Sequence, residues 1–138
     1  MNARSRCQRR RRHRRGAAVV EFAITTPIVF MFFVGIIILA QASLLRDTAQ
    51  HAAYEGARAV IMPGADVEMA EAASSAILAT VGAQAANIDV QPDNLTTSTP
   101  EVTVTVALPM DANLWLHAPW LPDSWLVEES ITLRREVE

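Results

Sequence analysis

Residues 16–45 read GAAVVEFAITTPIVFMFFVGIIILAQASLL, and no charged residue lies between Phe22 and Leu45. As a helix with a rise of about 1.5 Å per residue, positions 22–45 extend over roughly 36 Å, more than the roughly 30 Å hydrocarbon core of a bilayer. The rest of a 138-residue chain is too short to bury so long a helix that is apolar on all sides. The stretch therefore predicts one membrane span over residues 22–45.

The charges of the chain lie unevenly on the two sides of this span. Eight of the 12 basic residues, all arginines, fall within residues 1–15, whereas four arginines accompany all 15 acidic residues after Gly16. The positive-inside rule then predicts a cytoplasmic N-terminus and a translocated, periplasmic or extracellular C-terminal body. Anionic lipid headgroups account for an arginine run beside a span, so we expect membrane lipid and no nucleic acid as a partner.

The sequence contains no pattern of residues that indicates catalysis. The three histidines are far apart at positions 13, 51 and 117, and the single cysteine, Cys7, lies within the arginine run. No metal-ligand spacing, no Ser/His/Asp grouping and no glycine-rich phosphate loop emerges from the sequence. We therefore expect no enzymatic activity, no cofactor and no metal site.

Two residues of the apolar stretch are unusual for a plain anchor. Glu21 adjoins the apolar core, where a charge costs about 2.5–3.5 kcal/mol at mid-membrane and less near the interface, so we expect it to have a partner. Pro27 has no amide hydrogen to donate, which predicts either a harmless bend or a hinge. The hydroxyls of Thr25 and Thr26 are placed to compensate part of the lost hydrogen bonding.

The segment from Arg14 to Phe22 combines a basic leader, a glycine, four small or apolar residues, a glutamate and an aromatic residue ahead of the span. It resembles the processing site of type IV prepilins and pseudopilins. The resemblance implies that a prepilin peptidase cuts between Gly16 and Ala17. Glu21 would then lie one helical turn after a new α-amino group, on the same face. The family implies that Glu21, together with Phe22, sets the register of subunits during assembly.

Two other fates of the chain stay open at this point. Ala40-Gln41-Ala42 also matches a signal peptidase site, which would release a secreted domain that begins at Ser43. Alternatively, the chain keeps its leader and acts as a single-pass anchor that displays a small periplasmic binding domain. The apolar stretch is longer than a usual signal peptide core of about 7–15 residues, and a signal peptide gives Glu21 no role.

The helical pattern continues beyond the span until Pro63-Gly64, which predicts one long helix over residues 17–62. One face carries small residues at spacings of three and four, namely Ala49, Ala52, Gly56 and Ala59. Such a seam lets another backbone come close, either that of another subunit or that of the chain's own domain.

Two motifs narrow the resemblance, GAAVVEFA at residues 16–23 and AAYEGAR at residues 52–58. Together they resemble the TadE-like proteins, minor pseudopilins of the tight-adherence (Tad) pilus system. The resemblance covers roughly residues 15–60. It implies a pilin-like protein of the inner membrane that acts in assembly of an adhesion pilus. Its partners would be the prepilin peptidase, other pilin or pseudopilin subunits and the Tad assembly machinery.

Residues 63–138 predict an acidic α+β domain. Asp66 is a suitable N-cap for a helix that runs to Val81 and stops at Gly82. Its apolar residues in line are Met69, Ala73, Ile77 and Val81. Alternation of apolar and polar residues predicts strands over residues 87–91, 101–108 and 127–137. The domain plan is therefore a leader at 1–16, a long helix at 17–62, then a short helix and a small antiparallel sheet.

Three tryptophans follow one another at intervals of five, Trp115, Trp120 and Trp125, with prolines between them. This spacing and the prolines predict a loop. Packing of the rings against the sheet or the long helix is the simpler expectation. The alternative is a knob that contacts the membrane interface or a partner, because an indole ring suits both settings.

Overall fold

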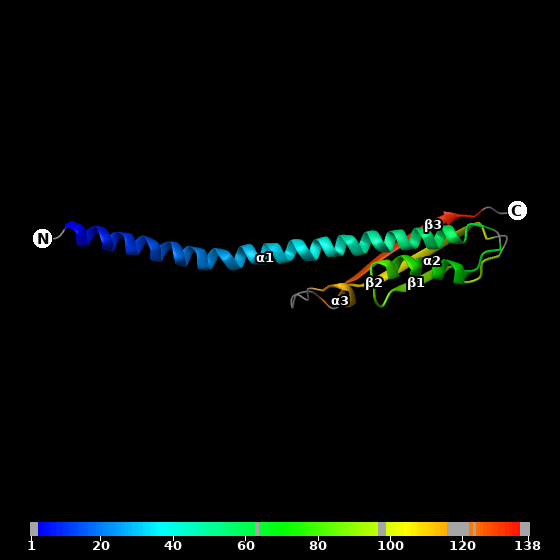
Figure 1. Cartoon of the computed structure of the whole chain (residues 1–138). Coiled ribbons are helices and arrows are strands. Elements are labelled where there is room, and N and C mark those ends of the chain that lie inside the picture. The colour runs from blue at the N-terminus through cyan, green and yellow to red at the C-terminus, as the bar shows by residue number, and fades with distance from the viewer. Residues whose placement is uncertain (1–2, 63, 97–98, 116–121, 123, 136–138) are drawn as a thin grey trace. The chain divides into compact units, whose positions relative to one another are not determined.

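The computed structural model describes residues 3–62, 64–96, 99–115, 122 and 124–135, and side chains from residue 16 onward. Its elements, in chain order, are α1 (Ala3–Ala59), α2 (Val67–Thr80), β1 (Asn87–Gln91), β2 (Glu101–Pro109), α3 (Met110–Asn113) and β3 (Leu126–Arg134) (Figure 1). A long N-terminal helix followed by short helices and an antiparallel sheet confirms the predicted α+β class. Contacts divide the chain into an N-terminal unit, Met1–Ile38, and a C-terminal unit, Leu39–Glu138.

Helix α1 begins at Ala3 rather than at residue 17, because arginine is a good helix former and no breaker precedes the span. It ends at Ala59, three residues before the predicted end. A turn follows in which Gly64 adopts a φ of +89°, a conformation that glycine tolerates best, and Pro63 lies outside the described residues. Within α1 the segment Gly16–Ala59 is long and apolar enough to cross a membrane.

The C-terminal unit has two layers, in which the last part of α1 and helix α2 cover one face of a three-stranded antiparallel sheet (Figure 1). The strand order is β1-β2-β3. Val90 lies opposite Val104 in the β1–β2 pair, and Val104 lies opposite Ile131 in the β2–β3 pair. The three predicted strands are therefore present. Strand β3 ends at Arg134, and residues 136–138 of its predicted range lie outside the described residues.

The core of this unit lies between the sheet and the two helices. The alternating residues of β2 are buried as predicted, with Val102, Val104, Val106 and Leu108 at or below 1% exposure. The residues that α1 contributes are small or aliphatic: Leu45, Ala49, Ala52, Ala53, Ala57 and Val60. Small side chains on the helix allow its backbone to lie close to the valine-rich strand.

Helix α2 confirms its predicted ends. The Asp66 carboxylate accepts a hydrogen bond from the Met69 amide at 3.1 Å, and Gly82 adopts a φ of +68° just beyond the last turn. The predicted apolar face is wrong by about one position. The buried residues are Ala70, Ser74 and Leu78, whereas the predicted line is partly or largely exposed: Met69, Ala73, Ile77 and Val81. A face of small residues permits a closer approach to α1 than the larger side chains would.

Arg135 ties the end of β3 to two other parts of the unit. Its guanidinium donates to the Thr96 carbonyl at 3.0 Å and to the Met62 carbonyl at 3.1 Å, and its amide donates to the Pro100 carbonyl. The side chain is 5% exposed. A buried charged donor that bonds two carbonyls of separate loops fixes the turn after α1 against the loop before β2.

We expect Arg135→Met to lower the free energy of unfolding by about 2 kcal/mol, because it removes charge-assisted hydrogen bonds from a buried site. Arg134 is the matched control, since the preceding residue of β3 is exposed, and Arg134→Met should change stability by less than about 0.5 kcal/mol. Denaturant unfolding of the detergent-solubilised full chain measures both. Equal effects of the two substitutions would contradict a structural role for Arg135.

Candidate functional site

The predicted processing segment lies inside α1, and its side chains are exposed. Gly16, Ala17, Glu21 and Phe22 all have exposed positions, with Phe22 at 71% exposure. A Cβ added at Gly16 meets no other atom within 4 Å. Glycine within a helix costs about 0.5–1 kcal/mol relative to alanine, so the fold of the chain gives no reason for a glycine here. The described part of the fold does not require a glycine at position 16, and the same holds for Gly35.

Glu21 is four residues after Ala17 in α1, so their side chains lie on one face of the helix, a turn apart. Among the side chains that the structure describes, from residue 16 onward, Glu21 has no ion-pair partner. The carboxylate is thus available to a positive group that arrives at this turn. An α-amino group on Ala17 would be such a group.

The hydroxyls before Pro27 are satisfied inside the helix. Thr25 donates to the Glu21 carbonyl and Thr26 to the Phe22 carbonyl, both at 2.7 Å. These carbonyls lie one turn back from each threonine, so neither hydroxyl replaces the bond that Pro27 itself cannot make. The carbonyl that Pro27 leaves without an amide donor is that of Ala23, and the expected compensation by Thr25 or Thr26 is wrong there. Pro27 nevertheless lies within the continuous helix α1.

The small-residue seam lies against the chain's own domain. Ala49, Ala52 and Gly56 are buried in the C-terminal unit, and Ala59 is half-buried. This is the second of the two expectations for the seam. An additional role between subunits stays a prediction.

Gly56 is a point of close approach between α1 and α2. A Cβ at this position would overlap Ser74 Oγ and would lie 3.1 Å from the Ala70 carbonyl oxygen. Ser74 Oγ in turn donates to the carbonyl of Ala52, a residue of α1, at 3.0 Å. The sequence pattern identified Gly56 and Ala52 as a place of close approach, but nothing in it singled out Ser74 as the residue that occupies the space.

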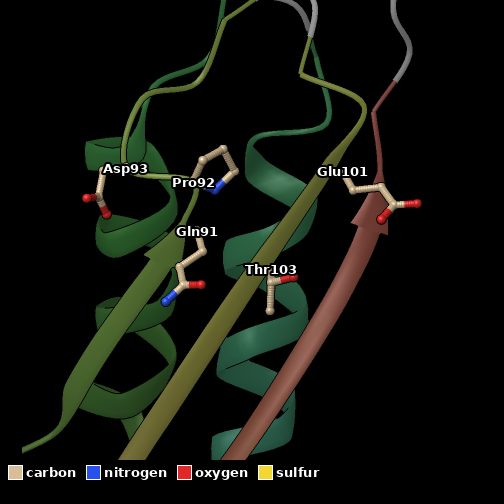
Figure 2. Close-up of a pocket in the computed structure, with 5 residues that line it drawn as sticks. All are labelled: Gln91, Pro92, Asp93, Glu101 and Thr103. Atoms are coloured by element: carbon tan, nitrogen blue, oxygen red, sulfur yellow. The ribbon is translucent and has the colours of Figure 1, made fainter.

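An open hollow of about 510 Å³ lies at the outer face of the sheet, where β1 ends and β2 begins. Figure 2 shows its lining side chains on the side of the strands away from the two helices. Its lining is polar, comprising Gln91, Pro92, Asp93, Glu101 and Thr103. Within the described part of the chain, no group of three or more His, Cys, Asp or Glu residues is placed to hold a metal ion.

Two tryptophans are exposed in the C-terminal unit. Trp115 is 75% exposed and Trp125 is 42% exposed, so the expected packing of the rings is wrong for Trp115. Trp120 lies outside the described residues, as does His117, while His51 is exposed on α1. These two indole rings are therefore available for a contact outside the chain's own core.

Comparison with known proteins gives one match. The family model of TadE-like proteins matches residues 16–58, which begins at the glycine of the predicted processing site and ends one residue before the end of α1. No curated protein and no solved structure matches the chain significantly. The match confirms the resemblance drawn from the two sequence motifs.

TadE-like proteins are structural components of pili. The matched segment covers all but the last residue of the helical segment that is long and apolar enough to cross a membrane. It includes three of the four residues of the small-residue seam, Ala49, Ala52 and Gly56. Residues 59–138, which hold α2 and the sheet, lie beyond the match. Residues 16–58 are therefore similar to the TadE-like proteins of the Tad pilus system.

Proposed function

We propose that this protein is a minor pseudopilin that acts in assembly of a Tad-type adhesion pilus. It is made as a prepilin, cut by a prepilin peptidase between Gly16 and Ala17, and packs into an assembly through its N-terminal helix. The observation that carries this proposal is Gly16 itself. It is the first residue of the TadE-like match and lies in an exposed stretch of α1, one residue before Ala17 and five before Glu21.

Cleavage changes the electrostatics of the helix terminus. It removes the arginines of residues 1–15 and creates an α-amino group on Ala17, one turn before Glu21. The carboxylate then neutralises an amine, either its own or that of a neighbouring subunit, and also favours the positive end of the helix dipole. A pair between subunits sets their register, because an unpaired charge within the apolar bundle is costly.

The proposed location is the inner membrane, with the N-terminus in the cytoplasm and residues 63–138 on the periplasmic or extracellular side. The arginine-rich start and the acidic remainder support this orientation through the positive-inside rule. The span keeps the protein in lipid before assembly. In the assembly, the exposed apolar side chains of the N-terminal unit contact the helices of other pilin or pseudopilin subunits.

Complementation of a deletion strain tests this function. Three versions are expressed: the full chain, a chain that begins at Ser43 behind an unrelated signal peptide, and a chain whose residues 16–45 are replaced by an unrelated span. Pili are counted by electron microscopy, and attachment to a surface is measured alongside. We expect only the full chain to restore both.

The two altered versions separate the alternatives. Restoration by the version with the foreign span would identify a plain anchor that displays a periplasmic domain. Restoration by the version that begins at Ser43 would identify a secreted domain. Either result would overturn the pseudopilin proposal, provided that immunoblots show equal amounts of the three proteins.

A further inference from the structure

The two exposed tryptophans lie at one end of the C-terminal unit, and the contacts of this unit fix which end. A cavity of about 430 Å³ is lined together by α1, by the turn after α2 and by the segment after α3. Its walls include Gln41, Leu44 and Leu45 of α1, Gly82 after α2, and Trp115. Trp115 therefore lies beside the α1 turn at residues 41–45.

Strand β3 and helix α1 run in the same direction through this unit. Arg46 Nε donates to Glu129 Oε1 near the start of this stretch, and the Arg135 guanidinium donates to the Met62 carbonyl near its end. Residue numbers therefore rise together along the strand and the helix. Positions on β3 can be assigned to levels along α1 from these two contacts.

The beginning of β3 lies at a level of α1 that precedes Arg46, toward the N-terminal end of the helix. Leu126 precedes Glu129 by three residues, which is about 10 Å along a strand. The same distance along α1 is roughly six to seven residues, which leads to the level of Leu39. Trp125, next to Leu126, thus lies close to that level. The strand geometry and the cavity place the two tryptophans at the same end of the unit by independent contacts.

This end coincides with the point at which the proposed span leaves the bilayer. A hydrocarbon core of about 30 Å takes roughly 20 helical residues, so a span that starts at Phe22 leaves the core near Gln41. The next charge in the chain is Arg46. The level of residues 39–45 is therefore the headgroup layer, where water, lipid headgroups and the ends of acyl chains meet.

The exposed surface at this level includes four large apolar or aromatic side chains. Leu44, Trp115, Trp125 and Leu126 are all exposed, each at 42% or more. Indole rings combine an apolar body with a polar N–H group, and they concentrate at membrane interfaces for that reason. These residues lie beside the part of α1 that directly follows the span, so chain connectivity keeps them near the bilayer surface.

We infer that Trp115 and Trp125 anchor the base of the C-terminal unit in the headgroup layer of the same bilayer that α1 crosses. The occupant of this surface is a phospholipid interface. The indole rings insert beside the α1 turn at residues 41–45 and tether the sheet to the lipid surface. The inference rests on a span that enters the hydrocarbon core at Phe22 and leaves it near Gln41, and not on the role in a pilus.

Tryptophan fluorescence of the full chain in phosphatidylethanolamine–phosphatidylglycerol vesicles tests the inference. One variant keeps only Trp115, through Trp120→Phe and Trp125→Phe, and a second keeps only Trp125. The control variant has all three tryptophans replaced by phenylalanine and carries Tyr54→Trp, an exposed α1 position roughly 13 Å beyond Leu45. Quenching by aqueous iodide is compared with quenching by lipids brominated near the headgroup or near the chain end.

Trp115 and Trp125 should be quenched most by lipids brominated near the headgroup and should be largely protected from iodide. The tryptophan at position 54 should show the opposite pattern. Free access of iodide to Trp115 and Trp125, with no quenching by any brominated lipid, would overturn the inference. Protection from both quenchers, or quenching that depends on protein concentration in the vesicles, would assign the surface to a protein partner and would also overturn it.

Vesicle flotation and circular dichroism precede the fluorescence measurement. A chain that fails to float with vesicles would remove the span on which the inference rests, whereas the complementation experiment reports on the pilus role separately. If a phenylalanine variant loses its folded spectrum, the unaltered chain with all three tryptophans is measured instead. Its emission in vesicles should then be quenched most by lipids brominated near the headgroup. Absence of that quenching would contradict the anchor.

Discussion

Glu21→Gln is expected to reduce incorporation of the protein into pilus assemblies by roughly 100-fold, while cleavage after Gly16 continues. Glutamine keeps the shape of the side chain but leaves the α-amino group of Ala17, its own or that of a neighbour, without a counter-charge. An unpaired charge within an apolar helix bundle costs about 2.5–3.5 kcal/mol, and each 1.4 kcal/mol is about a tenfold change in an equilibrium. The loss should therefore appear in assembly and not in membrane insertion.

The measurement compares the amount of the protein in sheared pilus fractions with the amount in the membrane. Glu55→Gln is a matched control, because Glu55 lies on the same helix beyond the span and its ion pair with Arg58, 3.7 Å long, is exposed. Exposed pairs contribute about 0–1 kcal/mol, so this variant should assemble normally. Normal assembly of the Glu21→Gln protein would show that charge pairing at this turn does not set subunit register.

Gly56→Ala should lower the free energy of unfolding of the C-terminal unit by about 2 kcal/mol. The new Cβ overlaps Ser74 Oγ and crowds the Ala70 carbonyl, so Ser74 must abandon its hydrogen bond to the Ala52 carbonyl and the two helices must separate slightly. Overpacking of this kind costs about 1–3 kcal/mol, and loss of the hydrogen bond adds about 1 kcal/mol. The better helix propensity of alanine offsets about 1 kcal/mol.

A double-mutant cycle with Ser74→Ala distinguishes this mechanism from a general effect of alanine. Removal of the Ser74 hydroxyl relieves the overlap, so the double variant should be more stable than the sum of the two single effects by about 1 kcal/mol or more. Gly35→Ala is the control within the same helix, since a Cβ there meets nothing within 4 Å. Strict additivity of Gly56→Ala and Ser74→Ala would contradict the close contact between α1 and α2.

Local patterns were sufficient for the two longer helices and the three strands of this fold, whereas the short helix α3 was not predicted. The charge-free stretch predicted a helix because only a long apolar helix satisfies such a sequence, and the alternation of Val102, Val104 and Val106 predicted a half-buried strand. Asp66 and Gly82 marked the ends of α2 because capping is a property of a few adjacent residues. In each case the physical cause lies within one or two turns of chain.

Features that depend on distant partners were not predictable in the same way. The buried face of α2 contains Ser74, which is polar, because its hydroxyl reaches a carbonyl of α1 that lies 22 residues earlier in the chain. Arg135 follows a strand and resembles any surface arginine, yet it binds the Met62 carbonyl across 73 positions. No local pattern reports that such a partner exists.

The candidate site shows the same division. Gly16 and Glu21 were identified from adjacent residues through resemblance to a family, and the structure places them on an exposed helix where nothing in the fold requires them. Ala49, Ala52 and Gly56 were recognised as a surface of close approach. The sequence of α1 alone does not indicate which backbone approaches them, because that depends on where α2 lies.

Processing at Gly16 is the central claim, and the intact mass and N-terminal sequence of the membrane-extracted protein test it most directly. The protein is purified from cells with and without a prepilin peptidase. A chain that begins at Ala17 only when the peptidase is present is the predicted result. A chain that retains Met1 in both strains, or one that begins at Ser43, would contradict the account and identify a plain anchored protein or a secreted domain, respectively.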